Sequence, residues 1–230
     1  PNPDGSSSSY KVYRNTTMAP GLEVTFPNIR TYNAIDINNP ANVVKFDITP
    51  QGFHAMILTG DKGSIFIDPY THGDTHNYQV YYKKDYANTN PNRLTCEVDE
   101  TSSVLDKPVF GGTTNKFGTC ELRTYRLALS CTGEYAAAVG GGTVAGALAA
   151  QVTTMNRVNG VYERDVAVTL TIIANNNLLI YTNAGTDPYT DNNANALINE
   201  SQTNITNIIG NGNYDIGHTF STGGGGLAGL

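Results

Sequence analysis

The sequence predicts an α+β protein in which a β-rich N-terminal region is followed by an α/β unit. Three observations support this fold class. Short β-type segments separated by turn residues fill the chain before residue 118. A periodic apolar helix pattern over Val144–Val158 then follows, and after it comes the β-branched run Val166–Ile173. The change of pattern near residue 118 divides the chain into residues 1–118 and 119–230.

Four strands are predicted in the first region. Val43–Ile48 is one strand, and Phe53–Leu58 pairs with Ser64–Asp68 through a glycine-containing hairpin turn. Tyr78–Tyr82 supplies a further strand, so we expect a small antiparallel sheet or sandwich. Residues 87–118 are rich in Asn, Thr, Gly and Pro, which indicates a linker or an extended surface segment.

The second region begins with a strand over Leu122–Ser130 and continues with a helix. Thr143 is the expected N-cap of this helix and Gly160 its expected end. One apolar face is indicated by the spacing of Val144, Leu148, Val152, Met155 and Val158.

Further elements alternate strand and helix. The nearly continuous β-branched run Val166–Ile173 is typical of a central strand, and Leu178–Thr182 predicts a shorter one. A second helix opens within residues 191–195 and ends at Gly210. Asp215–Ser221 then forms another strand. We therefore expect a twisted mixed sheet with two helices.

Charge and hydropathy limit the partners. The formal net charge is −6 and the pI is near 5.1, which argues against a nucleic-acid-binding surface. The sequence contains no apolar run long enough for a transmembrane helix, so no membrane span is expected. Only 15% of the residues are charged, and the polar residues are mainly Asn, Thr and Ser. This composition favours a secreted, extracellular protein.

The residues themselves contain no complete active site. His72 and His76 have the spacing of a helical zinc pair, but Pro69 and Gly73 favour an exposed loop. His54 and His218 are each expected to be hydrogen-bonded within a sheet. The glycines before Thr143 lack the pattern of a phosphate loop, and serine-nucleophile signatures are missing.

Four segments together resemble a known family. They are Leu122–Tyr135 (LRTYRLALSCTGEY), Met155–Asp165 (MNRVNGVYERD), Thr186–Thr190 (TDPYT) and Phe46–Met56 (FDITPQGFHAM). The first three resemble the front half of the catalytic domain of secreted bacterial reprolysin-like zinc metallopeptidases, which are metzincins. The fourth resembles the propeptide region of the same proteins, so the resemblance extends over the chain beyond about residue 25.

The resemblance implies a fold, an activity and a site. Residues 1–118 would be an inhibitory and chaperoning propeptide-like domain, and residues 119–230 the upper part of the catalytic domain. The family hydrolyses peptide bonds with zinc-activated water. An edge strand there aligns an extended polypeptide substrate, and by position the similar residues are Gly226, Leu227, Ala228, Gly229 and Leu230.

The family's zinc-binding helix, H-E-x-x-H-x-x-G-x-x-H, is not present in the 230 residues. We therefore interpret the chain as part of a zymogen-type precursor whose zinc ligands lie outside it. This chain is expected to be inactive alone. It is also expected to self-associate through surface left uncovered by the missing part.

Cys96 has two interpretations. A propeptide thiolate can occupy the open position of a zinc ion and block water, which would make Cys96 a metal ligand. Alternatively, Cys96 is in a disulfide or is a buried thiol. Cys120 and Cys131 can pair only if the chain before Leu122 folds back.

A second function class remains open at this point. The Asn/Thr/Gly-rich composition and the missing zinc motif are also compatible with a non-enzymatic secreted β-rich module for binding or adhesion. The two hypotheses differ in what the gene encodes downstream of Leu230.

Overall fold

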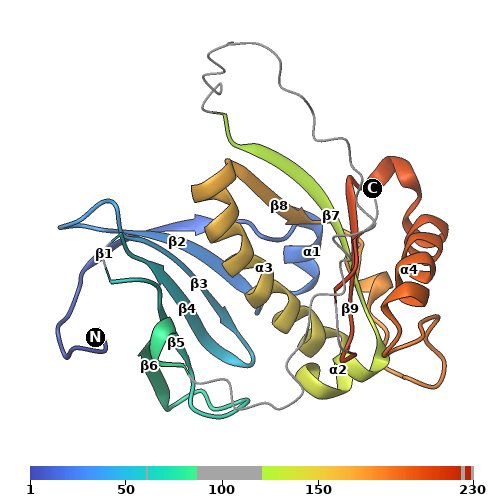
Figure 1. Ribbon diagram of the computed structural model, residues 1–230, viewed down its shortest axis with the longest axis horizontal. Helices are drawn as coiled ribbons and strands as arrows, with labels where there is room; N and C mark the ends of the chain where they lie inside the picture. The colour runs from blue at the N-terminus through green and yellow to red at the C-terminus, as the bar shows by residue number, and fades with distance from the viewer. Residues whose placement is uncertain (61, 87–120, 224–225, 229–230) are drawn as a thin grey trace, which may run out of the picture.

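The computed structural model describes residues 1–60, 62–86, 121–223 and 226–228. These residues form two sheets with helices between and beside them (Figure 1). In chain order the elements are β1 (Tyr10–Asn15), α1 (Pro20–Thr25), β2 (Arg30–Asp36), β3 (Val43–Thr49), β4 (Gly52–Leu58), β5 (Ile65–Pro69), β6 (Tyr78–Tyr82), η1 (Lys83–Asp85), β7 (Arg123–Cys131), α2 (Gly133–Gly140), α3 (Val144–Val166), β8 (Val168–Ile172), η2 (Asn176–Leu179), α4 (Ala194–Ile209), η3 (Asn211–Asn213) and β9 (Ile216–Phe220).

The first sheet is an antiparallel meander in the order β1-β2-β3-β4-β5-β6. The four strands predicted from sequence are all present, which confirms the β-rich N-terminal region. Strands β1 and β2 and helix α1 were not predicted. Residues 87–118, expected to be a linker, lie outside the described residues.

The second sheet is parallel and has the order β8-β7-β9. The α+β class is confirmed, but two details were wrong. Within the described residues this sheet is parallel rather than mixed, and its central strand is β7 rather than the β-branched β8. The sequence of β8 is typical of a central strand because α3 covers the strand and because Met18 forms a β-bridge to Ile172 on its outer edge.

Side chains on β7 alternate between two packed faces. Leu127 and Leu129 contact the α3 side, where they join the largest hydrophobic cluster. Ala128 points to the opposite face, where it packs with Ile205 and Ile209 of α4. Because both faces are covered, β7 is completely buried over its last five residues, Leu127–Cys131.

Two local predictions were wrong. Gly160 does not end α3, which continues to Val166 and finishes at Ala167 in a left-handed conformation. A side chain at Gly160 would approach Lys45 Cγ and Met56 Cε to 2.8 Å, so glycine is needed for close packing against the first sheet. Residues 178–182 form part of η2 and a single bridge instead of a strand.

Helix α2 was also missed. Its eight residues are too few to show a helical apolar period, although the Thr132 hydroxyl accepts an N-cap hydrogen bond from the Tyr135 N–H. In contrast, the start of α3 at Thr143 and the extent of α4, from the Asn193 cap to Gly210, agree with the sequence.

Within the described residues, no single helix is long and apolar enough to cross a membrane. Helices α2 and α3 reach the required length and composition only when counted together, and they are bent by 82° relative to each other.

Helix α3 packs between the two sheets (Figure 1). On the side of the first sheet the contacts are mainly polar. The Lys45 ammonium, which is 1% exposed, pairs with the Glu163 carboxylate at 2.6 Å, and Asp47 accepts a hydrogen bond from Thr153 at 2.8 Å. Arg157 pairs with Asp68 at 2.5 Å. The charged residues 163–165 belong to α3, and Glu163 is committed to Lys45.

Removing the two partners of the Lys45–Glu163 pair is expected to have unequal effects. Glu163→Leu leaves an ammonium buried without a counter-charge and should lower the free energy of unfolding by about 3 kcal/mol. Lys45→Met should lower the free energy of unfolding by about 1 kcal/mol, because the Glu163 carboxylate left without its partner can still reach solvent. Urea denaturation at neutral pH measures both values. Arg164→Ala, which removes an exposed pair with Asp165, is the control and should change stability little. Equal losses for Glu163→Leu and Lys45→Met would contradict this explanation.

Candidate functional site

The carboxyl ends of β7 and β9 lie side by side and are joined to a polar loop over residues 183–193. Cys131 is in register with Phe220, so Thr132 directly follows the end of β7 and Thr222 lies two residues beyond the end of β9. This edge of a parallel sheet is where α/β proteins commonly place functional side chains. Three side chains of the loop, Asp187, Tyr189 and Asp191, contact these strand ends.

Asp187 fixes the loop to the start of α2. Its Oδ2 accepts a hydrogen bond from the Gly133 N–H at 2.6 Å, and Oδ1 accepts one from the Tyr189 N–H at 3.0 Å. A carboxylate is favourable here because the first N–H groups of a helix have no partner within the helix. Gly133 is required by space, since a Cβ would lie 2.2 Å from the Ala184 nitrogen.

Asp191 connects the two strand ends to each other. Its Oδ1 accepts hydrogen bonds from the Thr132 hydroxyl at 3.1 Å and the Thr222 N–H at 3.1 Å. Its Oδ2 accepts a hydrogen bond from the Thr222 hydroxyl at 2.9 Å. The carboxylate therefore holds the ends of β7 and β9 at a fixed spacing.

Tyr189 reaches below the loop into the space between the sheet and α4. Its hydroxyl lies 2.6 Å from the Ser130 hydroxyl and accepts a hydrogen bond from Asn204 Nδ2 at 2.9 Å. Burial raises the pKa of this tyrosine above its ordinary value. Ser130 also donates to the Leu179 carbonyl at 2.7 Å, so it is a structural hydroxyl with no base beside it.

The site carries no metal-binding constellation. Both aspartates are already satisfied by N–H and hydroxyl donors of the chain. Across residues 1–60, 62–86, 121–223 and 226–228, no group of three or more His, Cys, Asp or Glu side chains could hold a metal ion. The side chains of this described part of the chain therefore do not fit a zinc ion.

The histidines are separate from one another. His72 and His76 lie in an exposed loop, as expected, and the His72 Nε2 is 2.9 Å from the Val139 carbonyl oxygen. His54 is hydrogen-bonded within the sheet to Asp47 at 3.0 Å, which confirms the expectation for this residue. His218 lies on β9 with its ring edge-on to Phe220, at 5.2 Å between ring centroids.

Of the cysteines, only Cys131 lies among the described residues. It is a free thiol, completely buried, and burial raises its pKa to about 12, so it is not a reactive group. Cys96 and Cys120 lie outside the described residues, so the proposed zinc-blocking thiol stays a prediction.

The predicted substrate-binding segment lies beyond β9. Gly226, Leu227 and Ala228 have no regular strand structure, while Gly229 and Leu230 lie outside the described residues. Its assignment as a substrate-aligning edge stays a prediction. In the described part of the chain β9 pairs with β7 alone, so its other edge is unpaired.

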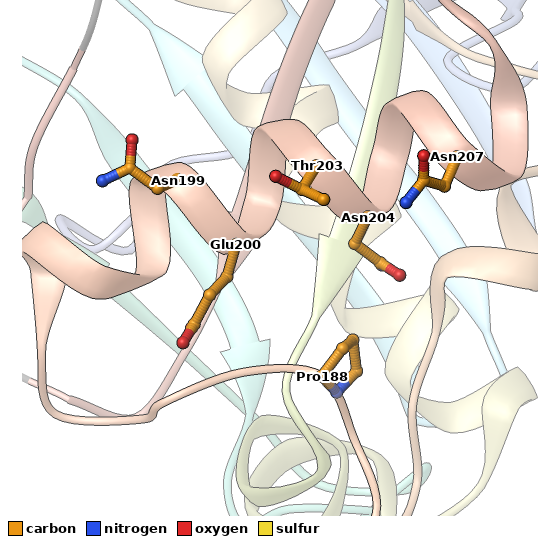
Figure 2. A pocket seen from close by; sticks show the side chains of 6 residues that line it. All are labelled: Pro188, Asn199, Glu200, Thr203, Asn204 and Asn207. Carbon is orange, nitrogen blue, oxygen red and sulfur yellow. The ribbon is translucent and has the colours of Figure 1, made fainter.

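A shallow depression of about 350 Å³ lies beside this region on α4 (Figure 2). Glu200 points into it and accepts hydrogen bonds from the Thr190 N–H and hydroxyl, both at 2.7 Å. The other lining residues are polar or proline, namely Pro188, Asn199, Thr203, Asn204 and Asn207. Among these lining residues Glu200 alone carries an ionisable side chain, and both of its carboxylate oxygens accept hydrogen bonds from Thr190.

One portion of the chain matches a known protein family. Residues 121–227 match the family described as Metallo-peptidase family M12B Reprolysin-like. This portion is reprolysin-like. The resemblance seen in the sequence is confirmed for it, whereas Phe46–Met56 lies outside the match. No curated protein matches the chain.

The loop of the reprolysin-like portion was recognised from sequence only in part. Thr186–Thr190 belongs to a run that carried the resemblance, but nothing in the sequence assigned roles to its residues. The pairing of Tyr189 with Ser130 joins residues 59 positions apart, so local spacing contains no signal for it. Asp187 and Asp191 lie four residues apart, which is no recognised metal-ligand spacing, so the sequence assigned them no role.

Asp187→Ala is expected to lower the free energy of unfolding by about 2 kcal/mol, because the Gly133 N–H at the start of α2 loses its acceptor. Neither calcium nor a chelator should shift the melting temperature of the unsubstituted chain, because the carboxylate oxygens of Asp187 and Asp191 already accept hydrogen bonds from the protein. Thermal denaturation with and without calcium measures both effects. Asp165→Ala, at an exposed position, is the control. A calcium-dependent rise in melting temperature that Asp187→Ala removes would contradict this assignment.

Proposed function

We propose that this chain is the part of a secreted zinc-dependent metalloendopeptidase precursor that aligns the substrate and keeps the enzyme latent. The observation that carries the proposal is the reprolysin-like match over residues 121–227, combined with a parallel sheet whose last strand, β9, is unpaired on one side. Members of the matched family are metallopeptidases. The assignment of zinc, secretion and latency to this protein is our proposal.

The proposed work of the reprolysin-like portion is to present backbone groups to an extended polypeptide. An unpaired strand edge offers N–H and C=O groups that bind a peptide with little dependence on its sequence. Asp191 and Asp187 support this arrangement because they fix the ends of β7 and β9 through direct hydrogen bonds. We propose that residues 226–230 continue this edge toward the substrate.

The catalytic chemistry is assigned to residues outside this chain. The sequence lacks the H-E-x-x-H motif, and the described residues do not fit a zinc ion. We therefore assign no hydrolytic step to any residue described above. Residues 1–118 would act as the inhibitory and chaperoning part, and the low charged fraction of 15% supports an extracellular location.

The zinc proposal can be tested on the chain itself and on a longer protein. The 230-residue chain should show no stoichiometric zinc binding by calorimetry and no cleavage of casein. A protein extended along its reading frame to include an H-E-x-x-H helix should cleave casein, and a chelator should abolish this activity. The matched control is the same extended protein with the motif glutamate changed to glutamine, which should be inactive. Chelator-insensitive cleavage by the extended protein, or zinc-dependent cleavage by the 230-residue chain alone, would overturn the proposal.

A further inference from the structure

We propose that residues 1–86 remain docked on the reprolysin-like portion after the connecting stretch 87–120 has been cut, so that the two pieces form a stable non-covalent complex. This inference concerns the regulation of the precursor and takes its biological meaning from the proposed function. It implies that proteolytic cleavage between the two portions does not release the N-terminal portion. A second event that breaks the interface is needed.

The first support is an apolar anchor from the N-terminal portion. Met18 and Leu22 are 1% and 0% exposed, and both belong to the main hydrophobic cluster of the reprolysin-like portion, together with Leu148 and Ile172. Leu22 on helix α1 shares this cluster with Leu127 of β7 and Leu170 of β8, beside which α1 is drawn in Figure 1. The residues that complete this core are therefore supplied by the portion that a cut would separate.

The second support is a backbone connection along the edge of β8. The Ile172 N–H donates to the Thr17 carbonyl at 2.8 Å, and the Ala19 N–H donates to the Ile172 carbonyl at 2.8 Å. The segment thus covers the outer edge of a buried parallel strand. Loss of residues 17–19 would leave the polar backbone groups of that edge without partners in an apolar setting.

The third support is a fully buried amide that the N-terminal portion satisfies. Asn156 on α3 is 0% exposed, and its Nδ2 donates to the Phe46 carbonyl at 3.0 Å. Its Oδ1 accepts hydrogen bonds from Asn15 Nδ2 at 3.2 Å and from the Thr17 hydroxyl at 3.3 Å. All of these partners come from residues 1–86, as does Lys45, the partner of Glu163.

These three sets of contacts act together. Apolar burial supplies attraction, while the buried amide and ion pair select a single docked geometry, since an unpaired buried polar group is costly. An interface of this kind resembles the interior of one folded domain more than a transient contact between two. Cutting the chain removes only the covalent tether.

The test uses the full chain with a recognition sequence for a site-specific protease inserted within residues 87–120. The folded protein is cut to completion, as judged by denaturing electrophoresis, and analysed by gel filtration at micromolar concentration. The two pieces should co-elute at the mass of the intact chain. Elution of the pieces in two separate peaks would overturn the proposal.

Matched variants locate the anchor. Leu22→Asp places a charge in the buried position, and after cutting it should raise the dissociation constant by about 100-fold or more. Val24→Asp, on the same helix but 79% exposed, should leave it unchanged. If Leu22→Asp fails to fold, Glu163→Gln takes its place, with an expected weakening of about 10-fold. Equal dissociation constants for the buried and exposed variants would refute the anchor.

This experiment is independent of the proposed peptidase activity. Separation of the cut pieces would overturn the retained complex and leave the metalloendopeptidase proposal standing. Failure of the extended protein to show chelator-sensitive cleavage would overturn the proposed function and leave the complex standing.

Discussion

Helix α3 has to satisfy two sheets at once, and the rest of the structure depends on this constraint. Toward β7 and β8 it presents apolar residues such as Leu148, Val152 and Met155, which form the main core with them. Toward the first sheet it presents Thr153, Asn156 and Glu163, which bind β3 through hydrogen bonds and a buried ion pair. A helix with this composition is stable only when both sheets are in place.

The constraint explains where function can lie. The face of the parallel sheet next to α3 is occupied by the core, and α4 covers the opposite face. Within the described chain, the open edge of β9 and the neighbouring strand ends are what this sheet can offer to a partner. The polar loop holds these strand ends with aspartates whose oxygens already accept hydrogen bonds from the protein, so its proposed contribution is positioning.

Periodicity and turn residues were sufficient to predict much of the fold. Strands β3 to β6, β7 and β9, and the starts of α3 and α4, follow from alternating or helical patterns and from caps such as Thr143 and Asn193. The predictions are wrong where contacts between distant residues determine the end of a helix or the place of a strand in its sheet. Gly160 was predicted to end a helix, but it lies within α3 and allows close packing on Lys45. Val166–Ile173 has the sequence of a central strand because residues 17–19 cover its edge. The candidate site depends on contacts between distant residues, which spacing alone cannot reveal.

Amide hydrogen exchange on the 230-residue chain compares the junction between the two portions with the core in one experiment. We predict that the amides of Ala19 and Ile172, which join the two portions, exchange only through global unfolding, with the same free energy as those of Leu129 and Val152. Exchange of Ala19 by a local opening, while Leu129 stays protected, would contradict the account. The two portions would then be independent units that happen to be in contact.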